Sequence, residues 1–179
     1  GGGGLPKARD AVHELQVTLE ELYTGAEKEL HIEKIDSPRA SRKPDTIKVH
    51  VDKGMRHGSK ITFRDGGDHI PGQCLPGDRI VVLGQAEHSR FQRKGDDLLL
   101  KHSIPLGQSL TRTGKIFIRH LDGRVLVSDV PDQIIAAGAV MKVDGEGMPV
   151  KGQPFEKGDL FIQFDVEFPE TLDEETVAK

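Results

Sequence analysis

Short stretches of the chain alternate strictly between apolar and polar residues. In Leu30-His31-Ile32-Glu33 and in Ile47-Lys48-Val49-His50-Val51, every second side chain is apolar. Residues 161–168 alternate in the same way as far as Pro169. A period of two is typical of a β-strand that buries one face and exposes the other to water. The pattern therefore predicts a protein built mainly of half-buried strands.

Turn-forming residues separate the predicted strands. Residues 115–121 and 125–127 flank Asp122-Gly123, a pair that tolerates the positive φ of a tight hairpin. Arg93-Lys94-Gly95-Asp96 is predicted to be a turn that leads into a strand over residues 97–102. The strands are therefore expected to follow one another closely.

Two segments depart from the strand pattern. Leu19-Glu20-Glu21-Leu22-Tyr23 predicts a short helical turn, which Gly25 can close in a left-handed conformation. Residues 35–45 contain Pro38 and Pro44 and show no periodicity, so we predict an exposed loop between two strands.

The chain contains one pattern twice, with an offset of about eighty residues. The first copy is Lys53-Gly54-Met55, Gly58, Lys60-Ile61-Thr62-Phe63 and Pro76-Gly77-Asp78, and the second is Gly138, Val140-Met141-Lys142-Val143 and Lys157-Gly158-Asp159. Such a spacing indicates two tandem domains. We predict a flexible linker or tag over residues 1–9, a first β domain over 10–87 that binds peptide, a second β domain over 88–170, and the start of a further segment over 171–179.

Composition limits the size of each core. Of the 179 residues, 35% are hydrophobic and 4% are aromatic, and a domain of roughly 80 residues buries only about 60% of its chain surface. Val, Ile and Leu supply most of the apolar residues and suit small sandwiches. The predicted fold class is all-β, with two tandem β-sandwich-like domains and short helical turns.

Charge and cysteine content exclude several classes of protein. The 25 basic residues are scattered among 29 acidic ones, for a net charge of −4, so nucleic acid is not an expected partner. The single Cys74 cannot form an internal disulfide. With no charged-then-apolar leader and no apolar run long enough to span a bilayer, we expect a cytoplasmic protein that has no membrane segment.

Two clusters of carboxylates are candidates for acid and base catalysis. They are Asp96-Asp97 and Asp144-Gly145-Glu146, and glycosidases use two such groups at a fixed separation. Both clusters adjoin glycine in turn positions, where Asp and Gly are selected for conformation. We therefore predict no enzyme activity, and an acid-base hydrolase stays a remote alternative.

Histidines suggest a metal site, but their spacing argues against one. The eight are His13, His31, His50, His57, His69, His88, His102 and His120. They contain no His-x-x-x-His pair, and no Cys-x-x-Cys accompanies them. We predict no metal and no cofactor, and we expect these side chains on the wet faces of strands.

Four apolar residues of the first domain are expected to share one face. Leu15, Leu30, Ile32 and Ile47 occupy alternating positions in three predicted strands. They either fill the core of the first domain or line an apolar channel at its edge. The pattern alone favours the core.

Ordered motifs across most of the chain resemble one family, the DnaJ-type co-chaperones. In the first copy they are Val12-His13-Glu14-Leu15, residues 17–25, Gly54-Met55, Ile61-Thr62-Phe63, Ile70-Pro71 and Pro76-Gly77-Asp78. In the second they are Arg93-Lys94-Gly95-Asp96-Asp97-Leu98, His120-Leu121-Asp122-Gly123-Arg124, Gly145-Glu146-Gly147-Met148-Pro149, Lys157-Gly158-Asp159-Leu160 and Phe168-Pro169-Glu170. The match is to the carboxy-terminal substrate-binding region, and the motifs are most similar to those of type A members.

The resemblance implies a protein that holds extended apolar segments of unfolded clients for a DnaK-type, ATP-driven chaperone. In that family the client adds to a strand edge while apolar side chains enter a pocket of the first domain. Carried onto matching positions, the peptide-binding residues are Leu15, Leu30, Ile32, Ile47 and Val81. The resemblance therefore favours the channel over the core.

The sequence departs from the family pattern in three ways. It lacks the His-Pro-Asp motif of a J-domain, and residues 36–45 stand where type A members insert zinc-binding Cys-x-x-Cys-x-Gly-x-Gly repeats. Val81 stands where many members carry Phe, which implies a wider or shallower pocket. The chain stops at Lys179, where members continue into a dimerising helix, so we expect a monomer here and a homodimer for a longer protein.

A second interpretation concerns the partner chaperone itself. Type B members dock its acidic Glu-Glu-Val-Asp tail, and Lys28 and Lys48 lie near the predicted channel. Three carboxylates on the same strand would repel that tail: Glu27, Glu29 and Glu33.

Overall fold

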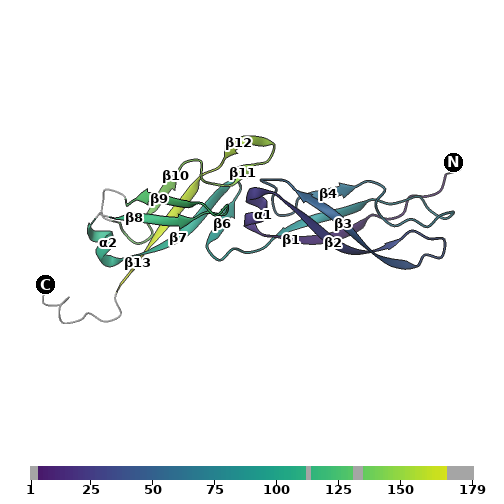
Figure 1. The fold of residues 1–179 in the computed structure, drawn as a ribbon, viewed down its shortest axis with the longest axis horizontal. Helices are drawn as coiled ribbons and strands as arrows, with labels where there is room; N and C mark the ends of the chain where they lie inside the picture. The colour runs from purple at the N-terminus through teal and green to yellow at the C-terminus, as the bar shows by residue number, and fades with distance from the viewer. Residues whose placement is uncertain (1–3, 112–113, 131–134, 169–179) are drawn as a thin grey trace. The chain divides into compact units, whose positions relative to one another are not determined.

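The computed structural model describes residues 4–111, 114–130 and 135–168. The chain divides into two compact units, Gly1–Glu87 and His88–Lys179, and strands are the main regular structure in each (Figure 1). The predicted all-β fold is confirmed. The further segment predicted over residues 171–179 lies outside the described residues.

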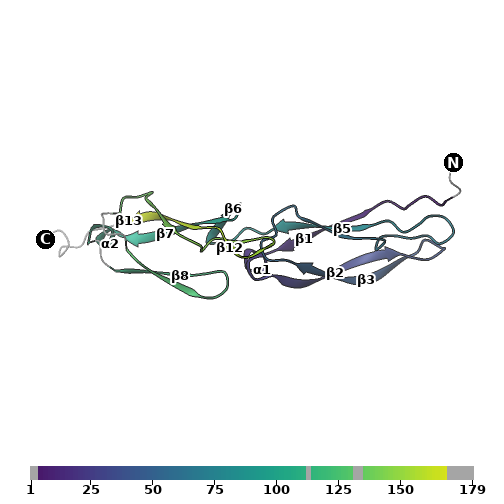
Figure 2. The ribbon, with the colours of Figure 1, turned by 90° about the horizontal axis from the view of Figure 1, so that it is seen from above.

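The first unit consists of two layers. Its elements are β1 (Ala11–Val17), α1 (Leu19–Thr24), β2 (Ala26–Ile35), β3 (Arg42–Val51), β4 (Lys60–Phe63) and β5 (Arg79–Gln85). One layer is a sheet of order β1-β5-β4, in which β1 runs parallel and β4 antiparallel to β5. The other is the antiparallel hairpin β2–β3. Figure 2 shows the hairpin lying against the sheet.

Alternation decides which side of each strand fills the space between the layers. In β2, Ile32 is buried while its neighbours His31 and Glu33 are exposed. The other inward side chains that are buried in this unit include Leu15, Val17, Val49, Val51, Val81 and Leu83. Full burial of one such side chain stabilises the fold by about 1.5–3 kcal/mol.

The predicted helical turn is confirmed as α1, and its start is set by a capping box. The Thr18 hydroxyl accepts a hydrogen bond from the Glu21 backbone N–H at 3.2 Å, and the Glu21 carboxylate accepts one from the Thr18 N–H at 3.0 Å. Gly25 ends the helix with φ 79° and ψ 154°. The positive φ favours glycine, but this extended ψ is not the left-handed conformation that the sequence predicts.

The predicted loop is shorter than expected. β3 begins at Arg42, which pairs with Ile35 at the end of β2, so only residues 36–41 connect the strands. The loop prediction is therefore wrong for residue 35 and for residues 42–45. Pro44 interrupts the pattern but pairs with Glu33, a position that a two-stranded ladder tolerates because its strands have free edges.

The second unit adds strands to the same plan. Its elements are β6 (Phe91–Lys94), β7 (Asp97–Pro105), α2 (Leu106–Thr111), β8 (Lys115–Arg119), β9 (Val125–Asp129), β10 (Val140–Val143), β11 (Pro149–Val150), β12 (Gln153–Lys157) and β13 (Leu160–Glu167). The main sheet has the order β10-β13-β7-β6, and β8–β9 and β11–β12 are antiparallel hairpins. The predicted hairpin across Asp122-Gly123 is confirmed as β8–β9.

Backbone hydrogen bonds align the two units residue by residue. The Ala11 N–H donates to the Asp78 carbonyl oxygen at 2.8 Å, as the Leu98 N–H does to the Asp159 carbonyl oxygen at 2.9 Å. In both units β1 or β7 runs parallel to the last strand, β5 or β13. Ala11 therefore corresponds to Leu98, and the parallel registers extend the match to His13 with Leu100.

The Gly-Asp pair of the repeat serves the same contact in each unit. A Cβ on Gly77 would lie 2.5 Å from the Arg9 carbonyl oxygen, and one on Gly158 would overlap the Asp96 carbonyl oxygen. Only glycine fits so close to a crossing backbone. The echoed motif is thus a packing requirement at the start of β5 and β13.

The strand β6 was not predicted. The sequence indicates a turn over residues 93–96, but β6 continues to Lys94, which pairs with Asp97, so Gly95 and Asp96 alone make the turn. Four residues with two basic side chains carry too little alternation to predict a strand. The first unit has no counterpart of β6 among its described strands.

Candidate functional site

The five residues of the predicted pocket all lie on strands of the first unit. Leu15, Ile32 and Val81 are 8%, 6% and 0% exposed, so they belong to the core between the layers. Leu30 and Ile47 are only partly buried, and they stand opposite each other in β2 and β3. A closed core therefore continues into a partly open apolar pair.

Lys28 links the two layers at the end of this apolar face. Its Nζ donates to the Gln16 carbonyl oxygen of β1 at 2.9 Å and to Glu21 Oε1 at 3.1 Å. Burial raises the pKa of Glu21, but hydrogen bonds from Thr18 and Lys28 outweigh it and lower that pKa below its ordinary value. The bridge shows that the outer edge of β1 lies near the inward face of β2.

β1 and β2 each have one edge that is unpaired among the strands that the structure describes. β1 has β5 as its neighbour, and β2 has β3. In a parallel ladder successive residues turn their main-chain groups to opposite sides. Ala11 turns toward β5 and bonds there, so Val12 and Glu14 present their N–H and C=O groups outward. We call the five apolar residues and these two edges the edge site.

A buried, hydrogen-bonded arginine lies beside the edge site. Arg79 is 1% exposed; its Nε donates to the Gly66 carbonyl oxygen at 2.9 Å, and its Nη1 donates to His13 Nε2 at 2.6 Å. Asp68 Oδ1 lies 3.7 Å from Nη2. Burial and the neighbouring guanidinium lower the pKa of His13, against an opposing effect of Asp68. His13 is therefore a neutral acceptor.

Sequence reasoning missed this cluster. Arg79 occupies an inward position of β5, where the pattern Arg79-Ile80-Val81-Val82 gives no sign of which face is buried. The repeat contains a signal that this position points inward, because the corresponding residue of the second unit is the apolar Leu160.

The candidate catalytic carboxylates have structural partners instead. Asp97 Oδ1 accepts the Asp159 N–H at 2.8 Å, and Glu146 Oε2 lies 3.1 Å from Arg124 Nη2. Asp144 lies 3.2 Å from Lys142 Nζ, and Asp96 lies 4.0 Å from Arg93 Nη2. These contacts give the four carboxylates structural roles in turns and ion pairs.

The sequence predicts that the histidines lie on solvent-exposed faces of strands, but not all of them do. His120 is 2% exposed, and its Nε2 lies 2.8 Å from the Glu146 carbonyl oxygen. Burial lowers its pKa, although Glu146 and Asp122 oppose this shift. Within the described residues, His, Cys, Asp and Glu form no group suited to a metal ion.

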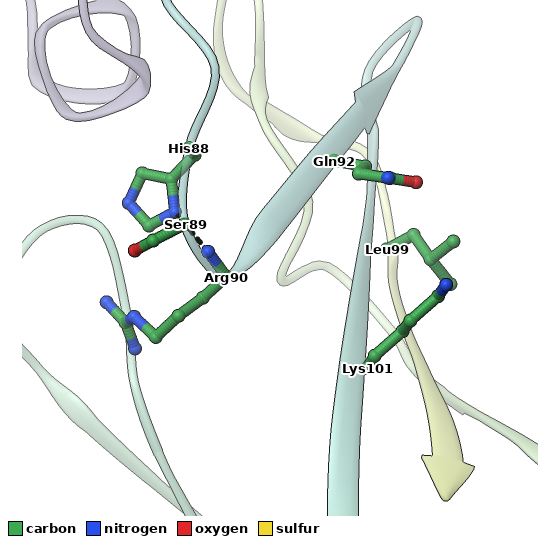
Figure 3. A pocket seen from close by; sticks show the side chains of 6 residues that line it. All are labelled: His88, Ser89, Arg90, Gln92, Leu99 and Lys101. Atoms are coloured by element: carbon green, nitrogen blue, oxygen red, sulfur yellow. Dashed lines mark hydrogen bonds between the residues drawn. The ribbon is translucent and has the colours of Figure 1, made fainter.

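A separate cavity of about 210 Å³ lies on the second unit. Figure 3 shows the side chains that line it, which come from β6, β7 and the segment before β6: His88, Ser89, Arg90, Gln92, Leu99 and Lys101. Arg90 is held in place, because its Nη1 donates to the Arg119 carbonyl oxygen at 2.7 Å. The lining is polar and basic, unlike the apolar face of the first unit.

Comparison with known families identifies the chain. The family model described as DnaJ C terminal domain matches residues 11–169. The chain therefore belongs to the DnaJ C-terminal domain family, and the resemblance predicted from its motifs is confirmed.

Individual relatives agree with this assignment. DnaJ homolog subfamily A member 2 of Homo sapiens is 49% identical over 125 residues, which cover 69% of this chain and 30% of that protein. DnaJ protein homolog 1 of Allium porrum is 42% identical over 127 residues, 70% of this chain and 32% of the relative. Chaperone protein dnaJ 3 of Arabidopsis thaliana is 40% identical over 127 residues, 70% and 30% respectively. The chain thus spans about a third of the length of these curated relatives.

The described residues contain two short helices. α1 and α2 are six residues each, and neither is long or apolar enough to cross a membrane.

Proposed function

We propose that the first unit holds extended apolar segments of unfolded polypeptides, as the client-binding part of a co-chaperone that serves a DnaK-type, ATP-driven chaperone. The observation that carries this proposal is the edge site, where unpaired edges of β1 and β2 flank an apolar face. Membership of the DnaJ C-terminal domain family supports it.

The client gains affinity from two kinds of contact. Its main chain extends a strand edge by hydrogen bonds to the outward groups of Val12 and Glu14 or to the free edge of β2. One apolar side chain of the client then covers Leu30 and Ile47, which are still partly open. Main-chain contacts are independent of sequence, so this mode suits many clients.

Charge at the edge site favours neutral or basic clients over acidic ones. Glu27, Glu29 and Glu33 are exposed along β2, and Lys28 is already engaged by Gln16 and Glu21. An acidic Glu-Glu-Val-Asp tail would be repelled by these carboxylates along β2. These contacts support client binding above docking of the partner's tail.

The proposal includes no catalytic step, because the candidate carboxylates are engaged in turns and ion pairs. It also includes a cytoplasmic setting and, for a longer protein with a dimerising helix, a homodimer. Pairing of subunits would offer a second edge site to one client and raise its effective concentration.

The test uses an uncharged, leucine-centred peptide labelled for fluorescence anisotropy. N-methylation at alternate residues removes the main-chain donors of one edge of the peptide only. We expect one alternate set to weaken binding by about tenfold or more, since several hydrogen bonds are lost, and the complementary set to leave binding within about twofold.

Equal effects of both methylated sets would refute strand addition. A peptide ending in Glu-Glu-Val-Asp serves as competitor. If it binds more tightly than the leucine peptide and displaces it, the site is a docking site for an acidic tail and the client proposal fails.

A further inference from the structure

The two units differ at the one edge that matters for the proposed function. β7 corresponds to β1, yet β7 has a neighbour on each side, β13 and β6. The edge that is unpaired on β1 is thus covered on β7 by the antiparallel strand β6. Figure 3 shows β6 beside β7, with Gln92 and Leu99 on the outer face of the pair.

The inward side of β6 is anchored by one aromatic residue. Phe91 stands opposite Leu100 and is 1% exposed. Its ring stacks on His120, which directly follows β8, with centroids 5.8 Å apart and an interplanar angle of 25°. The Arg90 guanidinium lies 5.2 Å from the centroid of the same ring. Phe91 therefore fills the space between the β7 edge and the β8–β9 hairpin.

Two sheet positions beside this space are apolar where the first unit has polar residues. Leu100 corresponds to His13, and Leu160 corresponds to Arg79, because both pairs hold equal places in the parallel registers. Leu98, Leu100, Leu160 and Ile162 are all at most 5% exposed. Such positions accept a large aromatic side chain without leaving a polar group unpaired.

We propose that the second unit contains the same peptide-binding edge site as the first, and that its own strand β6 occupies this site with Phe91 as the anchor. Once vacated, the site takes an extended polypeptide that runs antiparallel to β7 and carries an aromatic or large apolar residue at the position of Phe91. The inference rests on the client binding proposed for the first unit, although its test is separable.

Covalent linkage explains why the second site stays closed to clients. Only Gly95 and Asp96 join β6 to β7, so β6 is present at a high effective concentration that a free client does not match. The protein thereby presents one open site and one filled site per chain. A client centred on an aromatic residue is the ligand for the filled one.

The experiment counts bound peptides by isothermal titration with an uncharged, phenylalanine-centred peptide. The parent chain is expected to bind one peptide, and Phe91→Ala to bind two. Gln92→Ala is the matched control, because Gln92 lies in the same strand on the exposed face, and it is expected to bind one. Phe91→Ala that binds no more peptide than the parent overturns the proposal.

A second measurement applies if Phe91→Ala causes the second unit to lose its cooperative unfolding transition. A synthetic peptide of residues 89–95 is added to Phe91→Ala, and the same peptide with Phe91→Ser is the control. Recovery of the transition by the first peptide alone supports the proposal, and recovery by neither overturns it.

Failure of the two proposals is distinguishable. In the Leu30→Ser background, which weakens the first site, Phe91→Ala is expected to bind one peptide with unchanged affinity and the other about tenfold more weakly. A parent chain that binds none together with a Phe91→Ala variant that binds one would refute the function proposed for the first unit and uphold the filled site of the second.

Discussion

Leu30→Ser separates core packing from client binding at the edge site. Leu30 is partly buried opposite Ile47, so its replacement by serine should reduce the free energy of unfolding by about 2 kcal/mol. The unit spans Gly1–Glu87, and at about 0.05–0.15 kcal/mol per residue its total stability is about 4–13 kcal/mol. The variant should therefore remain folded at 25 °C.

Binding should fall by more than folding alone explains. If Leu30 contacts the client side chain, its loss should weaken the leucine-centred peptide by about tenfold, which is about 1.4 kcal/mol. Urea unfolding gives the stability. Fluorescence anisotropy in urea-free buffer, where the variant is folded, gives the affinity. The two measurements together decide whether Leu30 faces the client.

Glu29→Ser is the control, since Glu29 precedes Leu30 and points to the exposed face of β2. It should change the stability by less than about 0.5 kcal/mol and leave the uncharged peptide unaffected. The reasoning is refuted if Leu30→Ser binds as the parent does, or if Glu29→Ser weakens binding equally, because the client would then lie elsewhere or on the opposite face.

Three further predictions concern packing and pH. Val81 is 0% exposed, so Val81→Phe should overfill the core and lower the free energy of unfolding by about 1–3 kcal/mol in urea; an unchanged midpoint would reveal free space beside Val81. Burial and Arg79 lower the pKa of His13 from 6.5, so the unfolded chain binds the proton first as pH falls, and stability should decline below about pH 6.5; an NMR titration that gives His13 a raised pKa would contradict this. Gly158→Ala should unfold the second unit at lower temperature, because its Cβ overlaps the Asp96 carbonyl oxygen, whereas a Cβ on Gly107 meets nothing within 4 Å; equal melting of the two Ala variants would disprove the close packing.

The sequence by itself determined the local structure of this protein. Alternation in residues 30–33 and 47–51 is sufficient to predict strands because a strand has a period of two whatever it packs against. Asp122-Gly123 predicts a hairpin because the turn needs residues that tolerate positive φ. The echo of Gly77-Asp78 in Gly158-Asp159 identifies the duplication, since each pair meets the same steric demand.

The tertiary structure alone decided which edges are open. An unpaired edge depends on the strands that surround it, so nothing within β1 or β7 reveals that one edge is free and the other is covered by β6. β6 itself escaped prediction because a four-residue strand takes its stability from pairing with β7 and from Phe91, not from local propensity. The depth of burial was equally hidden: Ile32 and Leu30 share one face of one strand, yet Ile32 is closed off and Leu30 remains partly open. That difference arises because burial is set by the facing layer, whose position the sequence of a single strand does not contain.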